Sequence, residues 1–89
     1  MMKSKEDLKR EAAEAAIAYV KSGNVVGLGS GSTAYYAIEG IGGLVRSGQL
    51  QGITAVPTSE SSAELGRRFG IPLTDLEHTE HIDVTIDGA

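Results

Sequence analysis

The sequence predicts an α/β protein in which helices cover a parallel β-sheet. Two observations support this class. Helix and strand patterns alternate along the chain, beginning with a helix and ending with a strand. The first two strand patterns are each followed by small polar residues and then by a helical pattern, as in parallel strands joined by right-handed helical crossovers. The last strand pattern reaches almost to the final residue, so the predicted sheet stops after a strand.

The first helix is expected from residue 4 to about residue 21. Ser4 and Asp7 have the spacing of a capping box, and Ser22 with Gly23 marks the end of the segment. Apolar residues recur at helical spacing and define the face that we expect to be buried. This face consists of Leu8, Ala12, Ala15 and Tyr19, widened by Ala16, Ile17 and Val20.

The second helix is expected over residues 34–45, after a short strand at residues 24–28. Its apolar positions are three or four residues apart, which is the spacing of one helix face. Gly40, Gly42 and Gly43 weaken this prediction, because a glycine inside a helix costs about 1 kcal/mol relative to alanine. They indicate either that the second half of the helix frays or that it packs closely on a sheet.

The third helix is expected after a strand at residues 53–56, which Pro57 ends. Thr58 and Ser59 are candidate N-caps for this helix. Residues 82–86 then alternate between apolar and polar side chains, which predicts the final strand. One side of the third helix carries Ser62, Leu65 and Phe69.

The composition of the 89 residues argues against several classes of function. The net charge of −4, without a dense basic cluster, disfavours nucleic-acid binding. No apolar run approaches the roughly 20 residues of a membrane span, and the charged N-terminus does not read as a secretory signal. The absence of cysteine excludes disulfides, thiolate catalysis and cysteine-based zinc sites. We expect a cytoplasmic protein without nucleic-acid or membrane partners.

Residues 27–33, GLGSGST, form a glycine-rich turn between the first strand and the second helix. The turn does not match the dinucleotide-binding pattern, because Ser32 occupies the place of the third glycine and no acidic residue closes the second strand. It is not a Walker loop either, because no lysine precedes its Ser-Thr pair. We therefore expect neither NAD nor ATP, and no cofactor.

A single phosphate group suits the chemistry of this turn better. The first amides of a helix have no partner within the helix, and the helix dipole favours negative charge there. Glycines let the backbone approach an anion closely, while Ser32 and Thr33 add hydroxyl donors. A serine-capped turn without a ligand is the alternative, and the motif alone leaves both open.

Polar residues follow all three predicted strands. They are residues 29–33, the pair Thr58 and Ser59, and Asp87 before Gly88. In an open parallel sheet, ligands bind outside the carboxyl ends of the strands, so these residues are expected on one rim. Each has a structural alternative, since Thr58 and Ser59 can cap a helix and an aspartate before glycine suits a turn.

Other polar residues predict no site. Four potential metal ligands lie near the last strand, but their spacing matches no compact ligand set, and we expect no metal. They are His78, Glu80, His81 and Asp83. Tyr35 and Tyr36 are expected to pack the second helix rather than to stack on a sugar.

Taken together, these motifs resemble the A type of ribose-5-phosphate isomerase. The matching stretches are residues 6–9, 26–34, 58–59, 70–73 and 82–89, and with their order and distances they cover essentially the whole chain. The resemblance implies that residues 1–89 are the N-terminal part of one Rossmann-like isomerase domain. Related folds occur in sugar-sensing regulators and in amino-sugar phosphate deaminases, but the Ser-Gly-Ser-Thr-Ala run and the Asp-Gly-Ala ending favour the isomerase.

The resemblance also implies an activity and a set of site residues. The family interconverts ribose 5-phosphate and ribulose 5-phosphate through a cis-enediolate and requires no metal. By this resemblance, Asp87 is a catalytic aspartate that holds the sugar and its reacting end. The substrate-binding residues are Lys9, Gly31, Ser32, Thr33, Thr58 and Ser59, of which Lys9, Gly31, Ser32 and Thr33 bind the phosphate.

In the family, a second aspartate, a glutamate and the general base follow the stretch that matches residues 82–89. We therefore expect these 89 residues to carry the phosphate-binding turn and one sugar-binding aspartate of a phosphosugar site, but not to isomerise the sugar by themselves, because this chemistry needs a base within reach of the transferred proton. A non-catalytic phosphosugar-binding module and an inert folded fragment are the alternatives. We also expect either a homo-oligomer, such as a dimer, or marginal stability, because an uncovered final strand would expose apolar sheet surface.

Overall fold

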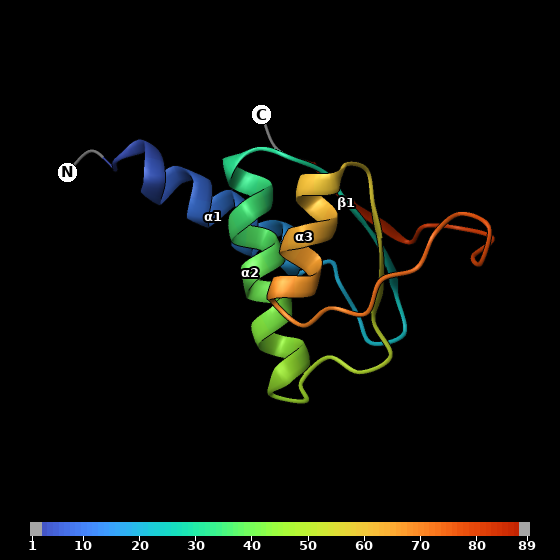
Figure 1. The fold of residues 1–89 in the computed structure, drawn as a ribbon. Helices are drawn as coiled ribbons and strands as arrows, with labels where there is room; N and C mark the ends of the chain where they lie inside the picture. The colour runs from blue at the N-terminus through green and yellow to red at the C-terminus, as the bar shows by residue number, and fades with distance from the viewer. Residues whose placement is uncertain (1–2, 88–89) are drawn as a thin grey trace.

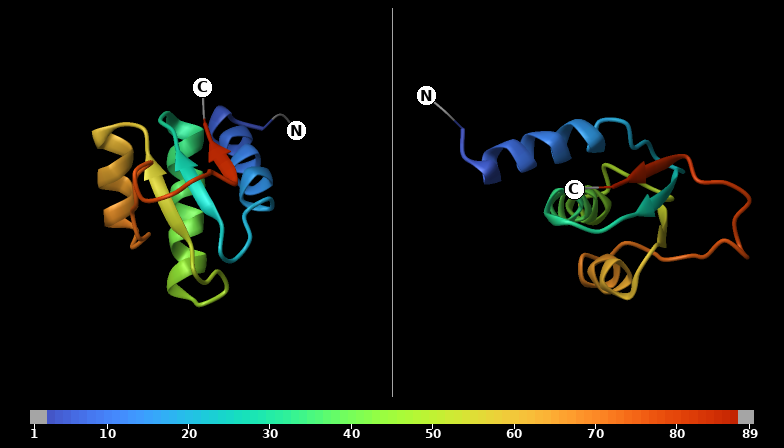
Figure 2. Two further views of the ribbon diagram at one scale, coloured as in Figure 1. Left: turned by 90° about the vertical axis from the view of Figure 1, so that its right-hand side faces the viewer. Right: turned by 90° about the horizontal axis from the view of Figure 1, so that it is seen from above.

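The computed structural model describes residues 3–87, and within them three helices lie on one face of a three-stranded sheet (Figures 1 and 2). In chain order the elements are α1 (Lys5–Ile17), β1 (Val25–Leu28), α2 (Ser32–Arg46), β2 (Thr54–Pro57), α3 (Glu60–Arg68) and β3 (Val84–Ile86). The predicted α/β class and the order of the elements are confirmed. Gly88 and Ala89, which end the predicted acidic motif, lie outside the described residues.

The sheet is parallel, with the strands in the order β2-β1-β3. Leu28, at the carboxyl end of β1, pairs with Pro57 of β2 and Ile86 of β3, so all three strands end at the same edge. Behind the sheet, α2 lies between α3 and α1, while the connection from α3 to β3 crosses the opposite face (Figure 2). That connection touches β2 at one point, where Leu73 bridges to Ala55.

The core lies between the sheet and α2. Val26 and Leu28 point to the helix side of β1 together with Ile86 of β3, and all three are almost fully buried. The opposing residues Ala34, Ala37, Ile38 and Ile41 recur at helical spacing on α2 and are fully buried. Alternate residues of the strands and residues three or four apart on α2 therefore pack against each other in one apolar layer. This layer holds the carboxyl edge of the sheet in place.

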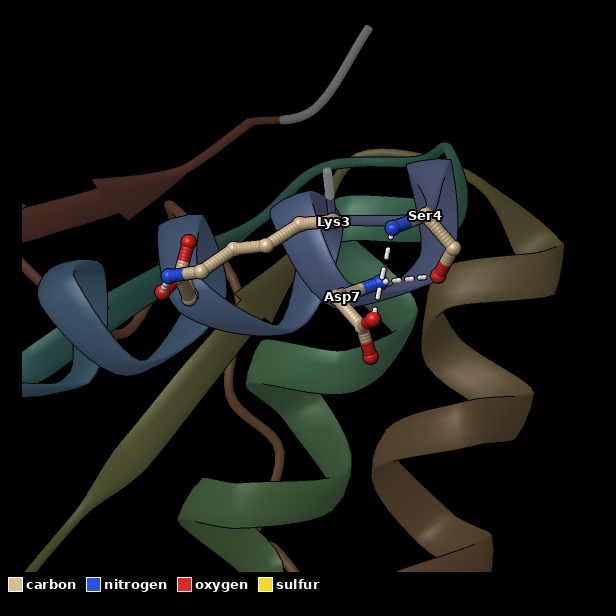
Figure 3. Close-up of polar contacts among 4 residues, drawn as sticks. Lys3, Ser4 and Asp7 are labelled. Atoms are coloured by element: carbon tan, nitrogen blue, oxygen red, sulfur yellow. Dashed lines mark hydrogen bonds and ion pairs between the residues drawn. The ribbon is translucent and has the colours of Figure 1, made fainter. Parts of the chain in front are cut away.

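The start of α1 confirms the predicted capping box. The Asp7 amide donates to Ser4 Oγ at 3.1 Å and the Ser4 amide donates to Asp7 Oδ2 at 3.3 Å, while Lys3 forms an ion pair with Glu11 (Figure 3). The predicted end is wrong, since α1 stops at Ile17. The amides of Tyr19 and Val20 donate three residues back, which tightens the chain into a turn before Ser22.

The predicted buried face of α1 is also wrong. Leu8 is 54% exposed and Tyr19 is 73% exposed, and Ala12 and Ala15 between them are exposed as well. The residues of this segment that belong to the core or pack against it are instead the three that were expected only to widen the face, Ala16, Ile17 and Val20, together with Ala13, which was not predicted.

The glycines of α2 explain this choice of face. The helix runs unbroken to Arg46, so the predicted fraying is wrong. A Cβ at Gly40 would lie 2.5 Å from Ile17 Cδ1, and one at Gly42 would lie 2.6 Å from the Phe69 carbonyl oxygen. Gly40 therefore allows α1 to pack closely on α2, and Gly42 does the same for the end of α3. The sequence suggested instead that these glycines allow close packing on a sheet.

Apolar surface is exposed away from the sheet, contrary to expectation. Val84 and Ile86 of the edge strand pack against the core, whereas Leu76 and Ile82 on the crossing connection are exposed, as are Leu8 and Tyr19 on α1. Within residues 3–87, no helix is long and apolar enough to cross a membrane.

Candidate functional site

The glycine-rich turn presents backbone amides at the carboxyl edge of the sheet. Gly31 is the N-cap of α2, with φ 106° and ψ 167°, a conformation that side-chain-bearing residues rarely adopt. Its carbonyl accepts from the Tyr35 amide at 3.0 Å. The amides of Ser32, Thr33 and Ala34 find no hydrogen-bond acceptor among residues 3–87. Ser32 and Thr33 are half-buried, whereas Ala34 is fully buried, so two of these donors and the positive end of the helix dipole lie at the accessible part of the turn.

Asp87 adjoins the start of the same turn. The Gly29 amide donates to the Ile86 carbonyl at 2.6 Å, which joins the ends of β1 and β3. A Cβ at Gly29 would lie 2.8 Å from Asp87 Oδ1. The exposed Asp87 carboxylate and the amide-bearing turn thus occupy neighbouring positions on one rim, as the strand order predicts.

Thr58 and Ser59 hold the third part of this rim together. The Thr58 amide and Oγ1 both donate to the Leu28 carbonyl, at 3.1 and 2.8 Å, which links the ends of β2 and β1. Ser59 Oγ accepts from the Ser62 amide at 3.1 Å and caps α3, as predicted. Both residues therefore lie at the expected edge and both have a structural function there.

Ser62 has a polar function that was not predicted from the sequence. Its side chain is 1% exposed, and its Oγ accepts from the amides of Thr58 and Ser59 at 3.2 and 3.1 Å. Ser62 thereby completes a capping box with Ser59. The spacing of two serines three residues apart, directly after a strand, is the signal that could have indicated it.

Lys9 lies on α1, beside a cluster that joins α1 to the second turn of α2. Its Nζ lies 4.0 Å from Glu6 Oε1, and its side chain is 33% exposed. The Tyr36 hydroxyl donates to Glu6 Oε2, and the Arg10 guanidinium lies 4.6 Å from the centroid of the Tyr36 ring. The hydrogen bond to Glu6 raises the pKa of Tyr36, with smaller contributions from burial and from the charge of Glu6.

A groove of about 160 Å³ lies between α1 and α2, on the helix side of the molecule. Arg10, Ala13 and Ile17 of α1 and Tyr36 and Gly40 of α2 line most of it. The groove is therefore distinct from the rim formed by the turn, Thr58 and Asp87, which is an open surface. We assign the candidate site to the rim because the amide donors and the carboxylate converge there.

The histidines near β3 form two separate pairs. His78 Nδ1 lies 2.6 Å from Asp75 Oδ1, and His81 Nε2 lies 3.1 Å from Asp83 Oδ1. The hydrogen bond from His78 lowers the pKa of Asp75. In the described part of the chain, no three His, Asp or Glu side chains gather as metal ligands would.

The fold and the rim define a class, the Rossmann-like α/β proteins with a glycine-rich turn between the first strand and the following helix. Comparison with known proteins indicates which family within this class the chain resembles. The family model of ribose 5-phosphate isomerase A (phosphoriboisomerase A) matches residues 54–89. Over its whole length the chain is similar to the N-terminal portion of proteins of this family, as the motifs predicted.

Curated relatives match nearly the whole chain. Ribose-5-phosphate isomerase A of Desulfatibacillum aliphaticivorans is 51% identical over 88 residues, which are 99% of this chain and 38% of that protein. The Synechococcus enzyme of the same name is 54% identical over 82 residues, which are 92% of this chain and 35% of that protein. The chain thus spans a little over a third of the length of these relatives.

Solved structures agree with the fold. A D-ribose-5-phosphate isomerase in complex with phospho-erythronic acid superposes with a TM-score of 0.94 at 36% identity, over 98% of this chain and 38% of that chain. Ribose 5-phosphate isomerase A from Methanocaldococcus jannaschii superposes with a TM-score of 0.89 at 40% identity, over 97% of this chain and 37% of that chain.

Proposed function

We propose that the chain forms the phosphate-binding part of a site that interconverts ribose 5-phosphate and ribulose 5-phosphate. The observation that carries this proposal is the pair of accessible amides of Ser32 and Thr33, which have no acceptor among residues 3–87 and lie at the start of α2. A phosphate dianion would accept both hydrogen bonds and would be stabilised by the helix dipole. The phosphorylated ligand of the solved relative supports this choice of anion.

Side chains complete the proposed phosphate site. Ser32 and Thr33 are half-buried and bring hydroxyl donors to the same end of α2. Gly31 has no side chain that could block the anion, and its φ of 106° turns the backbone into the helix. Lys9 reaches the phosphate from α1 and contributes a full positive charge.

Asp87 contacts the sugar in this proposal. Its carboxylate adjoins Gly29, on the same rim as the turn, so it can accept hydrogen bonds from sugar hydroxyls while the phosphate occupies the turn. Thr58 and Ser59 close the rim and keep the strand ends in register. Isomerisation moves a proton between the first two sugar carbons, and a base must lie within hydrogen-bond reach of that proton. We assign no such base among these residues and expect binding without turnover.

Two finer expectations belong to this proposal. Because Leu8 and Tyr19 expose apolar surface on α1, we expect the chain to self-associate, and a monomer in sedimentation equilibrium would contradict this. A cytoplasmic location stays a prediction, since a relative from Arabidopsis thaliana is named chloroplastic.

A titration with ribose 5-phosphate tests the proposal. The unmodified chain should bind the ligand saturably. Gly31→Val should reduce the affinity at least tenfold, because the substitution strains a backbone with a φ of 106° and adds a side chain at the start of α2. Gly48→Val is the matched control, since Gly48 also has a positive φ, of 82°, but lies at the other end of α2.

The outcomes separate clearly. Loss of binding in Gly31→Val with retention in Gly48→Val supports the assignment of the turn. Equal affinity of Gly31→Val and the unmodified chain would contradict the assignment of the turn as the phosphate site. An isomerase assay on the same preparation should give no turnover above the uncatalysed rate.

A further inference from the structure

Glu6, Arg10 and Tyr36 form a polar contact between α1 and α2 that no sequence pattern predicted. The Tyr36 hydroxyl donates to Glu6 Oε2, and the Arg10 guanidinium covers the Tyr36 ring at 4.6 Å from its centroid. Tyr36 lies four residues after Ser32, so it is about one turn beyond the start of α2. The contact therefore fixes α1 close to the turn that we assign to phosphate.

Lys9 lies beside this contact, next to Glu6. Glu6, Lys9, Arg10 and Ala13 recur at the spacing of one helix face, and Ala13, buried against α2, identifies that face. The two carboxylate oxygens of Glu6 serve different partners. Oε2 accepts from Tyr36, while Oε1 lies 4.0 Å from the Lys9 ammonium.

We propose that Tyr36 is a positioning residue that acts through Glu6 on Lys9. This rests on the proposed function, in which Lys9 binds the substrate phosphate. A free lysine samples many rotamers, and ordering it on binding reduces affinity. By holding the Glu6 carboxylate on the α2 side, the Tyr36 hydroxyl keeps the Lys9 ammonium close to the start of α2 before the phosphate arrives.

A double-mutant cycle tests this coupling, with inorganic phosphate as the ligand. Tyr36→Phe should weaken phosphate binding about three- to fivefold, the range expected for one exposed charged contact. In a Lys9→Gln background, the same change should have almost no effect, because the group on which Tyr36 acts is gone. A purely structural role of Tyr36 would weaken binding equally in both backgrounds.

Tyr35→Phe is the matched control. Tyr35 is the neighbouring residue, its ring meets those of Tyr36 and Phe69 edge-on, and its hydroxyl makes no hydrogen bond within residues 3–87. It should bind phosphate as the unmodified chain does. If Tyr36→Phe proves poorly folded by circular dichroism, Glu6→Gln removes the charge beside Lys9 while it retains an acceptor for Tyr36. It should show the same loss, again only when Lys9 is present.

Each outcome decides the question. Additive effects of Tyr36→Phe and Lys9→Gln, or an unchanged affinity of Tyr36→Phe, would overturn this inference and leave the phosphate site intact. Absence of phosphate binding by the unmodified chain would overturn the proposed function and this inference together.

Discussion

Gly29 and Asp87 lie so close together that a side chain at position 29 would collide with the aspartate. A Cβ at Gly29 would lie 2.8 Å from Asp87 Oδ1, 3.0 Å from Asp87 Cα and 2.6 Å from the Ile86 carbonyl oxygen. Two of these three atoms belong to the backbone, which cannot rotate away. The start of the glycine-rich turn and the position of Asp87 are therefore set by one contact.

Gly29→Ala should lower the free energy of unfolding by about 1 to 3 kcal/mol, because an added methyl group in a fully packed contact forces the backbone to shift. It should also weaken ribose 5-phosphate binding, since the shift displaces Asp87. Urea denaturation and ligand titration measure the two effects. A variant as stable as the unmodified chain would show that β3 does not hold Asp87 against the turn.

Gly42→Ala and Gly43→Ala should change stability in opposite directions. A Cβ at Gly42 would lie 2.6 Å from both Phe69 Cβ and the Phe69 carbonyl oxygen, whereas nothing lies within 4 Å of one at Gly43. Gly42→Ala should therefore destabilise the protein by about 1 to 3 kcal/mol. Gly43→Ala should stabilise it by up to about 1 kcal/mol, because alanine is the better helix former. Thermal or urea denaturation of the two variants measures both effects, and each variant serves as the control for the other. Equal changes in stability would contradict the packing of α3 on α2.

Ser59→Ala should cost about 1 kcal/mol of stability, because it removes the acceptor for the Ser62 amide at the start of α3. Ser59→Asp should retain the stability, since aspartate is an equally good N-cap. If Ser59 also lines the proposed site, the added carboxylate should weaken ribose 5-phosphate binding by charge repulsion. Full affinity in the stable Ser59→Asp variant would remove Ser59 from the site.

Asp75 should titrate below the usual range of an aspartate. The His78 side chain is the main cause of its lowered pKa, with smaller contributions from the backbone amides of Glu77 and His78. A carboxyl group with a lowered folded-state pKa contributes stability above its unfolded pKa and loses it as the pH falls through the folded value. His78→Ala should therefore raise the pKa of Asp75 toward its ordinary value and remove this acid-side contribution.

Carbon-13 NMR of the Asp75 carboxyl group during a pH titration measures the shift directly. His81→Ala serves as the control, because His81 pairs with Asp83 and not with Asp75. An Asp75 pKa that is the same with and without His78 would contradict the pairing of these two residues.

Local sequence patterns determined the element order, the caps at Ser4 and Ser59 and the position of the turn at residues 29–33. These features depend on residues a few positions apart, whose backbone preferences and hydrogen bonds act within one turn or one strand. The meeting of Asp87 with the turn also followed from the sequence, because parallel strands end at the same edge.

The tertiary structure alone decided which face of α1 is buried and what the glycines of α2 contact. The first helical segment contains two apolar stripes. The stripe with Leu8 and Tyr19 has larger side chains than the stripe with Ala13 and Ile17 and is therefore the stronger prediction for the buried face. The weaker stripe is buried because Gly40 leaves space for Ile17, 23 positions away along the chain. Such a choice depends on the shape of the partner surface, and so does the contact of Tyr36 with Glu6, 30 residues apart. Periodicity within a single helix contains no information about either partner.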